Sequence, residues 1–370
     1  PSSVYAQDAR EDEVIVVTGT RGAGRSQLST PAPVDVLTAE TLSQQGTSEL
    51  AEALSAVAPS IDFPRPSAVD GTDSIRPVTL RGLSPDQTLV LVSGTRRHAS
   101  ALVNVNGSVG RGSAAVDLNA IPVAALDRVE VLRDGASAQY GSDAIAGVVN
   151  LRLREAREGG GAAFSYGQYD TSVDPARSSR DVTDGETTSV SGWQGFALGD
   201  EGFLTVSAEF LQRDSTSRGD IDPNLLPAET VNSRFGDPEV EQYTIYANAG
   251  VPLSGVWEAY GWLGYQDRDS TSAAFPRRAN NVNNVPAIYP NGFLPLINVS
   301  SQDLTGAGGL RGEIGGWDAD VSLVYGRNAL DFRTQNSLNS TYGAASQTDF
   351  DAGSLIYGQT VLGIDFSREY

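Results

Sequence analysis

The sequence predicts a small α+β domain followed by part of an antiparallel transmembrane β-barrel. Short helix and strand patterns mix in the first half of the 370 residues, whereas the second half alternates apolar and polar residues with period two. Tight turns alternate with long polar loops between these patterns, as in outer-membrane barrels. No apolar run approaches the ~20 residues of a membrane-spanning helix, so a membrane protein of this composition requires a closed barrel.

Composition excludes several classes of function. The 26 basic residues stand against 46 acidic ones, and the net charge of -20 argues against a nucleic-acid partner. The absence of Cys removes disulfides, thiolate catalysis and Cys-based metal sites. His98 is the single histidine, and the glycine-rich stretch 107–112 is followed by neither Lys nor a helix pattern. We therefore expect no catalytic residue, metal site or cofactor.

The first half carries one helix pattern and several strand patterns. Over 41–57, after Thr38 as a capping residue, apolar residues lie at three- and four-residue steps or their sums, at Leu42, Leu50, Leu54 and Val57, and this spacing predicts a helix. Short stretches rich in branched residues predict strands at 34–37, 78–81, 89–92, 129–132 and 148–153.

The pattern changes near residue 158, where Gly159, Gly160 and Gly161 follow one another. We therefore predict a domain over 23–158 and the barrel portion over 159–370. The preceding segment 1–22 begins with a small-x-small pattern at Val4–Ala6, which indicates the remnant of an export signal. An ordinary disordered terminus is the alternative.

Period-two alternation in the second half predicts about eight strands, most of them long enough to cross a bilayer when tilted. Eight strands enclose only their own side chains, so they cannot hold the preceding domain. We therefore expect a chain cut short from a larger barrel of about 22 strands. The predicted strands are 162–172, 187–199, 203–214, 241–252, 256–268, 303–314, 317–334 and 354–368.

Aromatic residues near the strand ends are expected to form the girdles that flank the apolar band of such barrels. Packing within a soluble core is the alternative. The residues concerned are Tyr166, Tyr169, Trp193, Trp257, Tyr265 and Trp317.

Three stretches in the first half carry a family resemblance: Ser48–Pro59 (SELAEALSAVAP), Thr79–Arg97 (TLRGLSPDQTLVLVSGTRR) and Asp127–Asn150 (DRVEVLRDGASAQYGSDAIAGVVN). In order and spacing they resemble the successive signatures of the plug domain of TonB-dependent outer-membrane receptors. The resemblance covers the chain tightly over 13–153 and only in the style of its hairpins beyond. It implies an α+β plug domain beside a barrel.

A segment near the beginning of the chain resembles the TonB box, which pairs with the energy-transducing protein TonB. Such a β-prone segment could add as an edge strand to another protein's sheet. An internal plug strand is the alternative. The six residues of this predicted box are Glu13, Val14, Ile15, Val16, Val17 and Thr18.

Charged residues beside apolar positions of the plug should be buried and paired, because isolated buried charges are costly. By the resemblance, Arg81, Glu130 and Arg133 are candidates for a charge network with the barrel wall. Ordinary pairing within the plug is the alternative.

The resemblance implies active import across the Gram-negative outer membrane by a protein that is not an enzyme. The implied partners are outer-membrane lipid and TonB with ExbB and ExbD, and the box would lie in the periplasm. A ferric siderophore leads among substrates on family frequency, with carbohydrate or cobalamin as alternatives. Two other classes stay open: a passive or structural barrel, and a soluble carbohydrate-binding β-protein.

Family topology directs three plug segments toward the outside, here 62–76, 83–87 and 98–112. Their polar residues are the candidate ligand contacts, each of which could instead be an ordinary solvated loop residue. The candidates are Arg65, Asp70, Gln87, His98, Asn104, Asn106 and Arg111.

Overall fold

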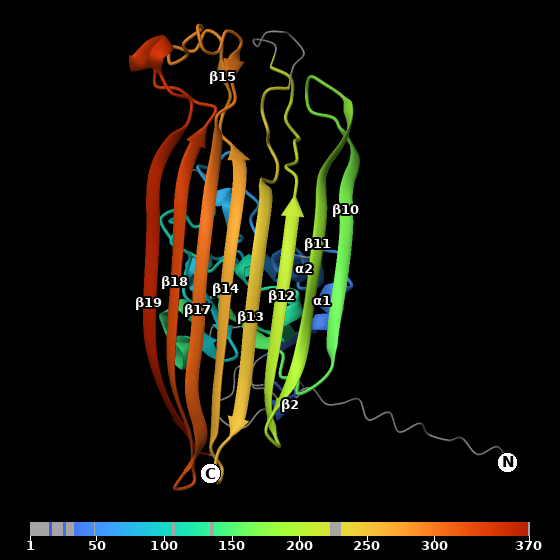
Figure 1. Cartoon of the computed structure of the whole chain (residues 1–370), viewed down its shortest axis with the longest axis vertical. Coiled ribbons are helices and arrows are strands. Elements are labelled where there is room, and N and C mark those ends of the chain that lie inside the picture. Colours follow the sequence, from blue (N-terminus) through green and yellow to red (C-terminus); the bar gives the residue numbers. More distant parts are fainter. Residues whose placement is uncertain are drawn as a thin grey trace, which may run out of the picture.

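Figure 1 shows the computed structural model, in which a small mixed domain lies behind one tall sheet. The structure describes residues 15–16, 25–26, 33–47, 49–105, 108–133, 137–222 and 231–368. We call the small domain, residues 33–153, the plug, and the eight-stranded sheet the wall. The predicted fold class is confirmed, since the plug combines helices with a mixed sheet and the wall is antiparallel.

The main sheet of the plug has five strands in the order β3-β8-β9-β6-β7. β6 and β9 are parallel, and the other neighbours are antiparallel. The strand predicted at 78–81 lies outside this sheet and is shorter: it is β5 (Thr79–Leu80), paired with β4 (Ile61–Asp62). The main-sheet strands are β3 (Val34–Thr38), β6 (Thr88–Val92), β7 (Thr95–Arg96), β8 (Leu126–Leu132) and β9 (Gly147–Leu153).

The prediction of one helix over 41–57 is wrong, because the structure has two helices there, α1 (Ala39–Ser43) and α2 (Leu50–Val57). The Thr38 side chain caps the first turn of α1, as its position indicated. Gly46 lies between the helices with φ +73°, a left-handed conformation that glycine adopts without steric cost. The chain therefore turns where the leucine spacing alone suggested continuity.

The remaining helices are short. No helix in the described ranges is long and apolar enough to cross a membrane. They are α3 (Ser137–Tyr140), η2 (Thr72–Ser74), η3 (Pro85–Gln87), η4 (Leu118–Ala120), η5 (Val123–Ala125), η6 (Ser142–Ala144) and η7 (Ser340–Ala345).

The wall pairs eight antiparallel strands in the order β10-β11-β12-β13-β14-β17-β18-β19, which confirms all eight predicted strands. Short turns connect them at one end, the turn side, and long loops at the other, the loop side (Figure 1). The strands are β10 (Gly160–Val173), β11 (Arg180–Leu198), β12 (Gly202–Arg213), β13 (Glu239–Pro252), β14 (Glu258–Ala273), β17 (Leu296–Ile314), β18 (Trp317–Gln335) and β19 (Phe350–Ser367). Two small pairs complete the sheets: β1 (Ile15–Val16) with β2 (Arg25–Ser26), and β15 (Arg277–Arg278) with β16 (Gly292–Phe293).

The two faces of the wall differ in polarity. On β12, Thr205, Ser207 and Glu209 are buried toward the plug, whereas Val206 and Phe210 face away from it. Polar side chains inside and apolar side chains outside are the arrangement of a transmembrane barrel rather than of a soluble sandwich. Exposed apolar side chains of the wall include Phe164, Val190, Phe196, Tyr243, Ile245, Leu263, Tyr265, Leu310, Leu323, Ile356 and Leu362.

One aromatic residue departs from the predicted girdle. The Trp193 ring faces inward, where the guanidinium of Arg154 lies over it at 4.3 Å. The next inward positions toward the loop side, Ser191 and Ser189, are small, which leaves space for the indole inside the wall. Its location near a strand end did not reveal which face it takes, because a shift of one residue reverses the face.

Apolar contacts join the plug to one part of the wall. The main core cluster of the plug includes Tyr246 of β13 and Trp262 of β14. A second cluster packs Ile75 of the plug against Val299 of β17 and Leu330 of β18. These contacts bury apolar area on both partners, and therefore favour a docked plug.

Candidate functional site

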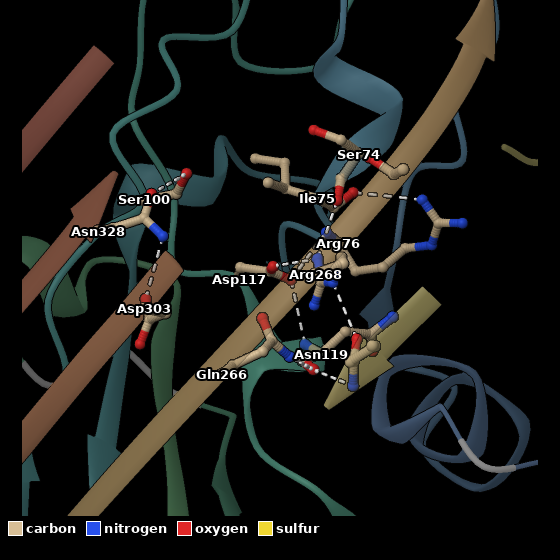
Figure 2. Close-up of polar contacts among 12 residues, drawn as sticks. Ser74, Ile75, Arg76, Ser100, Asp117, Asn119, Gln266, Arg268, Asp303 and Asn328 are labelled. Atoms are coloured by element: carbon tan, nitrogen blue, oxygen red, sulfur yellow. Dashed lines mark hydrogen bonds and ion pairs between the residues drawn. The ribbon is translucent and has the colours of Figure 1, made fainter. Parts of the chain in front are cut away.

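Asp117 connects the plug to the wall at the centre of their interface (Figure 2). Its Oδ1 caps η4, accepting the backbone N–H of Asn119 and that of Arg76, each at 3.1 Å. Its Oδ2 accepts a hydrogen bond from Nη1 of Arg268 on β14 at 2.6 Å. Both charged side chains are less than a tenth exposed. Because removing either partner would leave the other charge buried, this pair fixes the plug to β14.

Inward-facing side chains of β13 and β14 extend the contact (Figure 2). Arg268 also donates from Nη1 to the Ser74 carbonyl at 2.9 Å and from Nε to Oε1 of Gln242 at 2.9 Å. Gln266 donates to the Asn119 carbonyl at 2.7 Å. Alternate residues of a strand face the same side, which is why Gln266 and Arg268 both reach the plug.

Glu49, just before α2, forms a second ion pair with the wall. Its Oε2 lies 2.7 Å from Nη1 of Arg213 on β12, and its Oε1 accepts a hydrogen bond from Asn119 at 2.7 Å. Burial raises the pKa of Glu49, but the attraction of Arg213, Arg76 and Arg65 outweighs it and lowers the pKa from 4.5 to about 2. Glu49 is therefore a stable anion at neutral pH.

This ion pair predicts a pH-dependent stability. We expect Glu49→Gln to lower the free energy of unfolding near neutral pH by on the order of 3 kcal/mol, because the pKa falls from 4.5 to about 2 on folding. A depressed folded-state pKa contributes stability that is complete above pH 4.5 and disappears as the pH falls toward 2. Urea unfolding of wild type and variant should show the gap closing over this range. An unchanged gap would contradict the prediction.

A loop of the wall connects to the plug through Asp237, which precedes β13. Its carboxylate lies 3.1 Å from Nη2 of Arg65 and 3.2 Å from Nη2 of Arg76. Arg76 is buried, and its Nη1 donates to the Asp73 carbonyl at 2.9 Å. The loop, the plug segment around Arg76 and β14 therefore form one connected polar network.

Asp303 of β17 forms a separate polar cluster at the plug surface. Its two oxygens lie 2.6 Å from Nη2 of Arg97 and 3.0 Å from Nε2 of His98. Asn328 of β18 donates to Asp303 at 3.2 Å and accepts the N–H of Ala101 at 2.8 Å (Figure 2). Burial and the neighbouring Arg97 lower the pKa of His98 despite Asp303.

Gly326 of β18 leaves the space that His98 occupies. A Cβ at this position would overlap the imidazole ring. We expect Gly326→Ala to cost about 1–3 kcal/mol of stability by overpacking, with His98 displaced from Asp303. The matched control is Gly358→Ala on β19, where the nearest atom to the added Cβ is 3.9 Å away. Urea unfolding of both variants measures the difference, and equal midpoints would refute this role.

The residues predicted for a charge network make the contacts seen here within the plug. Glu130 is fully buried and lies 2.9 Å from Nη2 of Arg128. Arg133 pairs with Asp35 at 2.8 Å, and Arg81 donates to the Arg133 carbonyl at 3.3 Å. Arg81 and Arg133 are exposed, contrary to expectation, because each follows the last residue of its strand. A role for these three residues at the wall stays a prediction.

The predicted ligand-facing residues lie in different environments. Asp70 and Arg111 are exposed, and Gln87 is half-buried at the end of η3. Arg65 is partly exposed but is held by ion pairs to acidic residues of the plug and the loop. Asn106 lies outside the described residues. Contact of any of these side chains with a ligand stays a prediction.

Two of these candidates do not face solvent in the structure. His98 is 4% exposed and is held by Asp303, and Asn104 is 0% exposed. The Asn104 side chain donates to the Val109 carbonyl at 3.3 Å within its own loop. The expectation of exposure is corrected, because the His98 ring and the amide nitrogen of Asn104 have partners inside the protein rather than water.

Of the predicted TonB box, the structure describes only Ile15 and Val16. They form β1 and pair antiparallel with Arg25 and Ser26. The other four residues of the box lie outside the described residues. The backbone of this segment thus takes part in strand pairing, while its recognition by TonB stays a prediction.

Sequence reasoning missed the residues that join the plug to the wall: Arg76, Arg97, Asp117, Arg268 and Asp303. A signal was present on the wall, because Arg268 and Asp303 occupy the inward phase of their alternating strands. Their plug partners, Arg97 and Asp117, lie in or beside irregular segments, where no alternation of apolar and polar residues indicated which side chains point toward the wall. The interface therefore combines ion pairs and hydrogen bonds with the apolar contacts described above.

Comparison with known proteins places this geometry in a family. The model of the TonB-dependent receptor plug domain matches residues 26–148, the part that forms the domain behind the wall. Residues 26–148 are a TonB-dependent receptor plug domain. The predicted resemblance to this family is therefore confirmed.

Curated and solved relatives agree with this assignment. The vitamin B12 transporter BtuB of Vibrio cholerae serotype O1 is 31% identical over 166 residues, covering 45% of this chain and 24% of that protein. A mutant of the ferric enterobactin receptor PfeA of Pseudomonas aeruginosa shares the fold with a TM-score of 0.56 at 20% identity, over 90% of this chain and 45% of that one. The copper transporter OprC gives a TM-score of 0.50 at 14% identity, over 86% and 47%. This chain thus spans less than half the length of these relatives.

Proposed function

We propose that this TonB-dependent receptor imports a scarce or large nutrient across the outer membrane of a Gram-negative cell. The observation that carries the proposal is a plug bound through polar contacts to the inner face of a wall whose outer face is apolar. A passive barrel needs no plug, and a soluble protein gains nothing from an exposed apolar face. Outer-membrane lipid is the proposed environment of that face.

The proposed energy source is TonB, acting with ExbB and ExbD on the segment Glu13–Thr18 from the periplasm. The loop side would then face outward. In support, the segment 62–76 lies at the loop side: Ser67 accepts the N–H of Gly236 in the loop before β13 at 3.0 Å. This is the first of the three plug segments expected to meet a ligand.

For the substrate we propose a ferric siderophore, with cobalamin as the second candidate. The siderophore proposal rests on the family and on the shared fold of a ferric enterobactin receptor. Cobalamin is favoured by the 31% identity to a vitamin B12 transporter. Carbohydrate has no comparable support.

The test is uptake by cells that make the complete protein as their single receptor of this family. Iron-labelled ferric enterobactin and cobalt-labelled cyanocobalamin are offered in parallel, with and without a protonophore. Uptake of either probe that the protonophore abolishes supports energised import and identifies the class. Uptake that continues unchanged without a proton gradient would instead favour a passive barrel.

A further inference from the structure

The inner face of the wall is not uniform. β13 to β18 direct large side chains such as Tyr246, Trp262 and Leu330 into the packed clusters with the plug. β10 and β11 direct small hydroxyl side chains inward at paired positions, such as Ser165 opposite Ser189. In the described part of the chain, no residue of β10, β11 or β12 belongs to those packed clusters.

Two cavities lie on the side of the small residues. The first, of about 810 Å³, separates α1 and η5 from the inner face of β10–β12, and it is lined by Ser43, Arg154, Ser191 and others. The second, of about 350 Å³, shares Thr47 and Ser165 with the first.

These two cavities form one column along the strands, which extends from Gly185, toward the loop side, to Gly161 near the turn side. In Figure 1, α1 and α2 lie near the middle of β10 and β11. The Asp117 and Asp303 clusters occupy the neighbouring part of the interface, toward β14 and β17, and Asn119 joins the Asp117 cluster to Glu49 beside the column.

Two side-chain contacts border the column. In its upper half, the ion pair of Glu49 with Arg213 joins the plug to β12 at 2.7 Å. Near the turn side, the Arg154 guanidinium lies over the Trp193 ring at 4.3 Å. Both contacts are made by side-chain atoms alone.

We propose that this column is the route by which solute passes the plug, between α1 and the inner face of β10–β12. The proposal deepens the proposed function and rests on it. The lining combines hydroxyl groups with charges of both signs, including Glu40, Arg128 and Glu209. Such a lining suits a polar, hydrated solute, because each hydroxyl can exchange hydrogen bonds with water or solute. Apolar residues such as Val123 and Ala163 complete the lining, so the column offers both polar and apolar contacts.

The test uses single thiols, which these 370 residues do not contain natively, and labelling of the protein without an added thiol gives the background. Ser189→Cys reports on the column, while Ser270→Cys and Ser301→Cys report on the side that is packed against the plug. The three serines are matched in burial, at 4%, 2% and 5% exposed. Any difference in labelling therefore reflects opening of the structure rather than resting exposure.

Intact cells that make the complete protein are treated with a membrane-impermeant maleimide, with and without a protonophore. We expect the thiol at position 189 to react at least about ten-fold faster than those at 270 and 301, because regions of low local stability open more often. Equal or faster reaction at 270 or 301 would overturn the route, whatever the uptake assays show.

The protonophore arm separates this proposal from the proposed function. A preference for position 189 that falls when the proton gradient collapses supports both the route and energised import. A preference that persists unchanged supports the route and counts against energised import. Slow reaction at position 189 in cells whose uptake is energy-dependent would remove the route and leave the proposed function standing.

Discussion

Replacing Val16 by proline is expected to reduce uptake to the level seen in cells treated with a protonophore. Recognition of an extended segment by a partner's sheet depends on backbone hydrogen bonds, and proline removes one N–H donor and fixes φ. Val16 lies in β1 and pairs with Arg25, so its backbone adopts the extended form that strand addition requires. Uptake is measured with whichever labelled nutrient the wild type accumulates.

Two further variants control for effects other than loss of the backbone N–H at position 16. Val16→Ala keeps the N–H and should retain most of the uptake. Ser29→Pro places the same residue outside the predicted box, in a stretch that already contains Pro31 and Pro33, and should be tolerated. Binding of the nutrient at the cell surface should be unchanged in all three variants, since the box is distant from the loops. Normal uptake by Val16→Pro would remove the predicted box from the mechanism.

The wall could be predicted from the sequence because its rules are local. Period-two alternation decides which side chains of a strand face outward, and glycine-rich turns such as Gly315-Gly316 mark the strand ends. The two-helix structure around Gly46 was missed because leucine spacing continues across the turn. The inward face of Trp193 was missed because aromatic residues occur on both faces near strand ends.

The interface could not be predicted, for a different physical reason. Asp303 lies 206 residues from Arg97 in the chain, and no local pattern encodes a contact of that range. Loop composition suggested that His98 would see solvent. Its burial depends on Gly326, a residue of a strand that the sequence identified correctly but could not align with the plug. The alignment of a wall strand with the plug depends on the whole folded structure, so the pattern of one strand cannot predict it.

Asp303→Ala is expected to have the largest effect on plug docking, a loss of about 3–5 kcal/mol in the stability of the docked plug. The side chains of Arg97 and Asp303 are 1% and 6% exposed, so removal of the carboxylate leaves a guanidinium buried without its counter-ion. Hydrogen exchange of amides 97–102 in the complete purified protein, followed against urea, reports this loss. The control is Asp331→Ala, an exposed aspartate on β18. Equal protection in both variants would contradict the prediction.

A double variant separates the contribution of charge pairing from that of packing. Asp303→Leu combined with Arg97→Met removes both charges while keeping apolar volume, and such replacements of a buried pair are often neutral or stabilising. We therefore expect the double variant to recover most of the docking stability that Asp303→Ala loses. One outcome is that the double variant recovers stability and still imports more slowly than wild type. In that case the ion pair serves release of the plug, because charged groups can exchange one polar partner for another or for water, whereas the apolar side chains of the variant cannot. If stability stays low, packing around His98 rather than charge pairing holds this part of the plug.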